Sequence, residues 1–115
     1  MGFTLDQSES YTWPVTIEIP VDDGKYERSK FKGKFKRISQ SRVREMGELI
    51  GTDELTDVDV CKEVLIGWEG IEDADGEPET FSQSKLSQIL DVPLVATAIA
   101  TAFFESMMGG AKRKN

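Results

Sequence analysis

Residues 13–38 read WPVTIEIPVDDGKYERSKFKGKFKRI, and apolar and polar side chains alternate on both sides of a central turn. Alternation with a period of two is typical of a half-buried β-strand, because successive side chains point to opposite faces. The sequence Asp22-Asp23-Gly24 is typical of a tight turn. We therefore predict a β-hairpin with one apolar face and one lysine-rich face. Pro14 and Pro20 lack the N–H group that a central strand needs, so the first strand is expected at an edge of its sheet, or to be short.

Beyond residue 38 the apolar spacing changes from two to that of an α-helix. Ser39, Thr56 and Ser82 each precede such a stretch, and their side chains are suited to accept the N-cap hydrogen bond. We expect four helices: after Ser39 up to Gly51, from about 56 to 68, after Ser82, and from about 91 to 107. The predicted fold class is α+β, a single small domain with an N-terminal β-hairpin followed by about four α-helices. The helices, or another chain, must cover the apolar face of the hairpin, because a lone hairpin is marginally stable in water.

The chain of 115 residues is long enough for one hydrophobic core. We expect a flexible arm at residues 1–11, the domain at residues 12–108 and a flexible basic tail at residues 109–115. The arm lacks the basic and apolar regions of a secretion signal. The charge-free run 92–104 is shorter than the roughly 20 residues that a membrane helix needs, so no membrane span is expected. A single cysteine, Cys61, excludes an internal disulfide and fits a reducing cytosol.

The net charge of −7 is unevenly distributed along the chain. Residues 25–44 hold nine basic residues and one acid, whereas residues 53–79 hold eleven acids and one base. Nucleic-acid binding is not expected, because the net charge is negative and the hairpin lysines face away from the aromatic residues between them. Two solvated charged faces are one interpretation of this division. An acidic inhibitor that mimics DNA and binds a basic host protein is an alternative function, and self-association of such a dipolar molecule is also open.

Residues suited to catalysis are few. The chain has no histidine, which is the commonest general base and metal ligand. Cys61 lies on an apolar helical face without a histidine partner, so we interpret it as a core residue. The acidic run 72–77 matches a calcium loop only in part, because an EF-hand aligned on Gly76 would place Ile71 and Ser82 where carboxylates are needed. We expect no enzyme activity, no cofactor and no metal.

The last predicted helix is apolar almost all round, which indicates either a central core helix or one covered by a partner. Ile99, Phe103 and Met107 share one stripe of this helix, and Phe104 and Met108 lie off that stripe. Flexible Met and Phe side chains suit a surface that accepts variable apolar segments. These five residues are the candidate partner-binding site, and for Phe104 and Met108 both core packing and partner contact stay open.

The order of motifs resembles the tail assembly chaperones of long-tailed, siphovirus-type bacteriophages over most of the chain. A hairpin with an Asp-Gly turn leads into FKGKFKR at residues 31–37. VLIGWEG at residues 64–70 is followed by the acidic turn DADG at residues 73–76. Phe81-Ser82 and Asp91-Val92-Pro93 begin the last two helices, and AKRKN closes the chain.

The resemblance implies a non-catalytic protein of the host cell cytoplasm that is not retained in the mature virion. Such proteins bind the tape-measure protein, the tail-tube protein or both, and keep them soluble before tail assembly. In many relatives a ribosomal frameshift adds a C-terminal extension, and Gly109-Gly110 with residues 112–115 would form a natural junction for one. An exposed hairpin edge and surplus apolar helix surface favour a homo-oligomer. The family defines no catalytic residues, and none of its binding residues transfers by motif.

Overall fold

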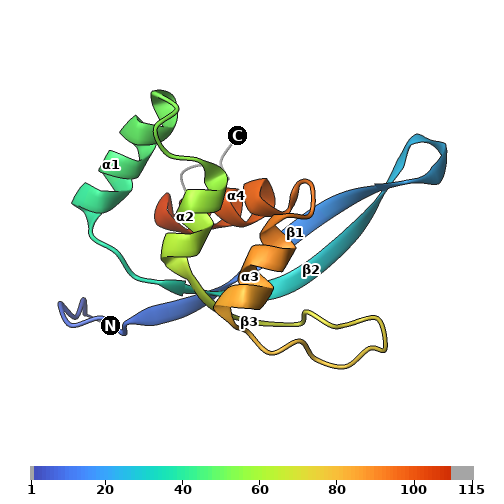
Figure 1. Cartoon of the computed structure of the whole chain (residues 1–115). Helices are drawn as coiled ribbons and strands as arrows, with labels where there is room; N and C mark the ends of the chain where they lie inside the picture. Colours follow the sequence, from blue (N-terminus) through green and yellow to red (C-terminus); the bar gives the residue numbers. More distant parts are fainter. Residues whose placement is uncertain (1, 110–115) are drawn as a thin grey trace.

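The structure is a computed structural model that describes residues 2–109. Its elements follow in chain order: β1 (Ser10–Val21), a 3-10 turn η1 (Asp22–Gly24), β2 (Lys25–Lys36), α1 (Gln40–Gly51), α2 (Asp57–Val64), β3 (Leu65–Glu69), α3 (Gln83–Leu90) and α4 (Val95–Met107). They form one small α+β domain, and the long β1–β2 hairpin projects beyond the helices (Figure 1). The predicted fold class, an N-terminal hairpin followed by four α-helices, is confirmed. The predicted basic tail lies outside the described residues, apart from Gly109.

The turn residues allow the hairpin to close at η1. Asp23 and Gly24 have φ angles of 65° and 71°, in the left-handed region. Glycine adopts this region freely, and Asp is one of the side chains that tolerate it. The two strands then pair antiparallel along their whole length, from Ser10 opposite Lys36 to the turn.

β1 is an edge strand, as its prolines predict. The backbone N–H of Arg37 donates to the carbonyl of Glu9 (3.0 Å), and hydrogen-bonded pairs alternate along an antiparallel ladder. The odd-numbered residues of β1 therefore bond to β2, whereas Pro14 and Pro20 lie where an N–H would point to the outer edge. Their missing donors leave the ladder intact and reduce the number of free groups on the exposed edge.

The sheet has a third strand that the sequence pattern did not predict. The helix expected from 56 to 68 ends at Val64, and Leu65–Glu69 pairs antiparallel with β2 as β3. This pairing satisfies backbone groups on the second edge of β2, and Gly67 makes a continued helix unfavourable. The prediction of one helix over this range was wrong because a tertiary partner for the backbone outweighs the apolar spacing.

An irregular register explains why β3 carried a helical apolar spacing. Leu65 lies opposite Phe35 and Gly67 lies opposite Lys34, so β3 has one more residue than β2 across this step. Such a bulge changes which face the following side chains use. Trp68 therefore returns to the apolar face of the sheet three residues after Leu65, where it packs against the core.

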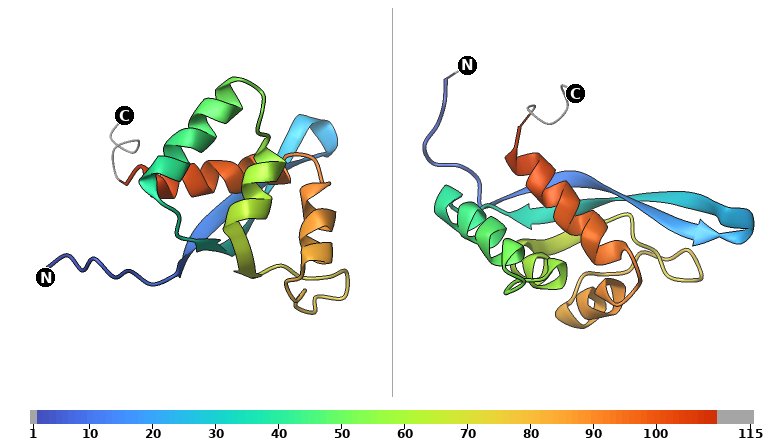
Figure 2. Two further views of the ribbon diagram at one scale, coloured as in Figure 1. Left: turned by 60° about the vertical axis from the view of Figure 1, so that its left-hand side comes forward. Right: turned by 90° about the horizontal axis from the view of Figure 1, so that it is seen from above.

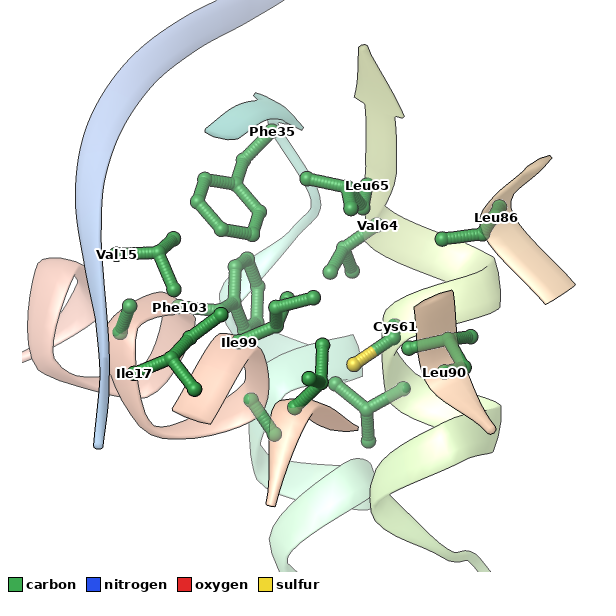
Figure 3. Close-up of a cluster of buried hydrophobic side chains, with 14 of the residues drawn as sticks. Val15, Ile17, Phe35, Cys61, Val64, Leu65, Leu86, Leu90, Ile99 and Phe103 are labelled. Atoms are coloured by element: carbon green, nitrogen blue, oxygen red, sulfur yellow. The ribbon is translucent and has the colours of Figure 1, made fainter. Parts of the chain in front are cut away.

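The helices cover one face of the sheet, and α4 crosses β1 while it also contacts α2 and α3 (Figure 2). Side chains from the sheet and from α4 meet in the centre of the core, where Phe35, Ile99 and Phe103 are fully buried (Figure 3). Cys61 of α2 is also fully buried, as predicted. On the opposite face, the lysines of β2 are exposed at positions 30, 32, 34 and 36.

The three predicted N-caps are confirmed. The side chains of Ser39, Thr56 and Ser82 accept hydrogen bonds from backbone N–H groups three residues later. At the start of α2 the cap is reciprocal, because the Asp59 carboxylate accepts from the backbone N–H of Thr56 (3.0 Å). Local sequence therefore sets where these helices begin.

Two predicted boundaries need correction. The last helix begins at Val95 rather than near 91, because Leu94 adopts a φ of 76° and ends the preceding turn. The N-terminal arm is shorter than residues 1–11, because Ser10 and Tyr11 belong to β1. Among residues 2–109, no single helix is long and apolar enough to span a membrane; α3 and α4 together have the length and composition, with a bend of 106° between them.

Candidate functional site

The five candidate residues of α4 divide between the core and the surface. Ile99 and Phe103 are fully buried, and the Phe103 ring centroid lies 5.7 Å from that of Phe35. The hairpin and α2 pack against this stripe of α4. The prediction that Ile99 and Phe103 contact a partner is therefore wrong for the folded domain, because no partner can reach them without opening the core.

Phe104 takes an intermediate position. It is partly buried, and its ring meets that of Phe103 edge-on, with centroids 5.3 Å apart and planes at 66°. Such pairs stabilise a core beyond their buried area. Phe104 therefore contributes to the core with one edge and reaches the surface with the rest of its ring.

The surface end of the set is formed by Met107 and Met108. Met107 is partly buried, and Met108 is 51% exposed just beyond the last turn of α4. Beside them is an open hollow of about 830 Å³, which we call the methionine hollow. Phe3 of the arm, Ile38 of the β2–α1 connection and Met107 supply its apolar side chains.

Polar residues of the same two segments complete the lining. The remaining lining residues are Gln7, Ser8, Glu9, Arg37, Ser39 and Gln40. Surfaces that bind other proteins combine apolar with polar side chains. The methionine hollow therefore has the composition of a protein-binding surface.

A hydrogen-bonded pair anchors the end of α4 behind the methionine hollow. The Ser106 hydroxyl donates to the carbonyl of Phe103 (2.6 Å), so the Tyr11 hydroxyl is the donor in its 2.7 Å contact with Ser106. Burial raises the pKa of Tyr11, which keeps this donor protonated. The Arg37 guanidinium lies 4.9 Å from the centre of the Tyr11 ring. The end of α4 that carries Met107 is thus held against β1.

No protein-family model, no curated protein and no solved structure matches this chain. The resemblance to tail assembly chaperones therefore depends on the order of the sequence motifs.

The acidic loop after β3 is ordered by its own side chains and by a tryptophan. The Asp73 carboxylate accepts hydrogen bonds from the backbone N–H groups of Asp75 (2.8 Å) and Glu77 (3.0 Å). Trp68 donates its indole N–H to the carbonyl of Glu79 (2.7 Å) and packs edge-on against Phe81. Within residues 2–109, no group of three or more His, Cys, Asp or Glu side chains is placed to hold a metal ion.

The acidic residues of segment 53–79 lie in separate parts of the molecule. One group follows α1 and continues along α2, whereas the other occupies the loop after β3, on the opposite side of the helices in Figure 1. The lysines of β2 lie on the open face of the sheet. On one side their neighbours are threonine and proline residues of β1, and on the other side is the edge strand β3. A DNA mimic requires acids arranged along one surface, and this separation does not supply such a row. The DNA-mimic alternative therefore stays a prediction without structural support.

Sequence reasoning missed the contribution of Phe3 and Ile38 to the methionine hollow. Both are separated from α4 by more than fifty residues, so no local pattern connects them to it. The available signal was composition: Phe3 and Leu5 are large apolar residues in an otherwise polar arm. Apolar side chains that the arm cannot bury by itself indicate a docking contact.

Proposed function

We propose that this protein is a non-catalytic assembly chaperone of the phage tail type. It covers apolar segments of the tape-measure protein, the tail-tube protein or both in the host cytoplasm, and leaves before the virion is complete. The observation that carries this proposal is the methionine hollow, which Phe3, Ile38 and Met107 line; Met108, the next residue in the chain, is 51% exposed. The motif order in the sequence supports the same function.

The mechanism that fits this surface is reversible masking. Tail subunits expose apolar surface before they assemble, and such surface aggregates in solution. Methionine side chains are unbranched and flexible, so they adapt to segments of different shape. A small open hollow binds weakly enough to release its partner when subunit contacts form, since interfaces of small area are typical of transient complexes.

The test is co-production of the full chain with the tail-tube and tape-measure proteins encoded in the same genome. The combined substitution Met107→Asp and Met108→Asp is expected to lose the gain in soluble partner, because it places two charges where apolar side chains enter. Leu94→Asp is the control for a charge placed away from the hollow, because Leu94 is 49% exposed at the other end of α4. Asp also tolerates the left-handed backbone found at that position.

The folded state must be checked in parallel by thermal unfolding. If the double Met variant kept as much tail protein soluble as wild type and Leu94→Asp do, the methionine hollow would not be the binding surface. A loss of solubility with both variants would show an effect unrelated to the hollow. Phe104 is a poor target for this test, because its packing against Phe103 couples it to the core.

A second observation requires only the nucleotide sequence. A frameshift junction would place a slippery run near codons 112–115, upstream of a very long open reading frame with helical periodicity. This arrangement would support the chaperone function and would identify the tape-measure protein to be used in the co-production experiment. Its absence would weaken the proposal.

A further inference from the structure

A second apolar groove lies under the outer half of the hairpin, and we call it the hairpin groove. It encloses about 480 Å³, a volume within the range of pockets that bind compact apolar groups. Its apolar lining comes from the hairpin, from the loop after β3 and from the α3–α4 connection, namely Ile17, Ile19, Phe31, Ile71, Ile89, Val92 and Val95. Glu72 and Asp73 of the loop after β3 also line it, and so does Lys30 of β2, whose side chain belongs to the open face of the sheet.

The arm at residues 2–9 carries apolar side chains that its own domain leaves exposed. Phe3 and Leu5 are each 84% exposed, more than any other large apolar residue among residues 2–109. They are two positions apart, so an extended arm presents both on the same side. Two exposed side chains of this size, in a segment outside every helix and strand, are suited to enter an apolar groove.

The arm cannot place Phe3 beside Ile17 of its own chain; within the groove only Phe31, which pairs with Val15 five residues after Ser10, falls within its reach. Phe3 lies seven residues before Ser10, where β1 begins, and Ile17 lies seven residues after it. At about 3.4 Å per residue Ile17 is about 24 Å along β1, whereas an arm that spends two residues on reversing its direction reaches back only about 17 Å. Leu5 reaches less far still. In both views of Figure 2 the arm also leaves the domain at the end remote from the hairpin tip.

We propose that the arm of one copy docks in the hairpin groove of a second copy, with Phe3 and Leu5 inserted between the hairpin and the α3–α4 connection. The groove lies under the outer half of the hairpin, and in Figure 1 the arm leaves the domain on the side away from the hairpin tip, so the contact runs head to tail. A head-to-tail contact uses two different surfaces, so it produces either a closed ring or an open filament.

Sedimentation of the full chain over a range of concentrations tests this proposal. Wild type is expected to associate. Phe3→Asp with Leu5→Asp is expected to weaken the association by roughly a hundredfold or more, because two apolar side chains are lost from the contact. Thr4→Asp is the control for charge, since it adds one of the two negative charges of the double variant to the arm, on the side away from Phe3 and Leu5. It is expected to associate as wild type does.

A mixing experiment separates this contact from other modes of self-association. Val92→Asp, at a position 44% exposed in the groove, removes the second surface but keeps the arm. Because each variant retains the surface that the other lacks, an equimolar mixture of Val92→Asp with the double arm variant is expected to form a complex with one copy of each. Leu94→Asp, two residues away and outside the groove, is the control for the charge at this turn.

Three results would overturn the proposal. The wild-type protein could stay monomeric at hundreds of micromolar concentration, or the double arm variant could associate as wild type does. The third is a mixture of the two variants that stays monomeric although each variant unfolds at the wild-type temperature. If Val92→Asp fails to fold, the arm variant still decides the question, since its substitutions lie outside the packed domain. This contact does not depend on the chaperone function. Self-association with no effect on tail proteins would contradict only the latter.

Discussion

Gly33 lies at the centre of the sequence FKGKF, and its missing side chain is required by the packing of β2. A Cβ atom at Gly33 would lie 3.0 Å from Cε2 of Phe35 and 3.1 Å from Cδ1 of Leu65. Both neighbours are fully buried, and the Phe35 ring is flanked by Tyr11 at 5.9 Å and Phe103 at 5.7 Å between centroids. Neither neighbour has room to move, so Gly33→Ala is expected to destabilise the domain.

The size of the effect follows from comparison with Gly47→Ala in α1. Gly47 has no atom within 4 Å of a Cβ and no unusual backbone angle, so alanine there removes only the flexibility of glycine. That backbone contribution stabilises by about 0.5–1 kcal/mol in the interior of a helix or strand. Gly33→Ala gains a similar contribution but adds the clash, which overpacking data place at about 1–3 kcal/mol. The difference between the two variants therefore isolates the clash.

Urea unfolding of both variants and of wild type measures this difference. We expect Gly47→Ala to unfold at a higher midpoint than wild type and Gly33→Ala to unfold roughly 1 M or more below Gly47→Ala, with unchanged slopes. If the two variants had equal midpoints, the Phe35 and Leu65 side chains must yield to the extra methyl group. The argument for tight packing under the hairpin would then be wrong.

Two further predictions concern Cys61 and the ion pair between α1 and α2. Burial raises the pKa of Cys61 to about 12, so a thiol reagent at about pH 8 is expected to label it only through unfolding; equal rates with and without denaturant would contradict this. The hydrogen bonds from Arg42 at 2.7 and 2.9 Å lower the pKa of Glu63 below its ordinary value of 4.5. The ion pair between Arg42 and Glu63 requires the charged form of the Glu63 carboxylate. Its contribution to the stability of the fold is therefore complete above pH 4.5 and is lost as the pH falls through the lowered pKa of Glu63. Glu63→Gln is therefore expected to lower the melting temperature at about pH 7 and to have a smaller effect at about pH 3; a constant difference would show that the charge of Glu63 is not involved.

The parts of the fold that local sequence specifies were predictable. The alternation in residues 13–38 specifies the hairpin, because only an extended chain places every second side chain on one face. The caps at Ser39, Thr56 and Ser82 specify helix starts, because each satisfies backbone N–H groups within three residues. These effects need no knowledge of the rest of the molecule.

The parts that depend on distant partners were not predictable in the same way. Leu65–Glu69 has an apolar spacing compatible with a helix, and it becomes β3 because the second edge of β2 is available. Phe3 and Ile38 reach the methionine hollow only after the hairpin and α4 are in place. The sequence showed that α4 has surplus apolar surface, but the choice between core and partner required the positions of β1 and α2.

In the structure, apolar surface is exposed after the C-terminal end of α4 and under the outer half of the hairpin, and not along the sides of α4. Within α4, Ile99 and Phe103 are covered by the domain's own sheet and helices, so the sides of the helix offer little to a partner. Met108 is exposed just after α4, whose last turn contacts Tyr11 through Ser106, whereas the hairpin groove lies under the outer half of the hairpin. Phe3 belongs to both regions, because it borders the methionine hollow of its own chain and is a candidate to enter the groove of the next. An arm drawn into a neighbouring groove would carry Phe3 away from Met107, so head-to-tail contact would change the apolar lining of the hollow.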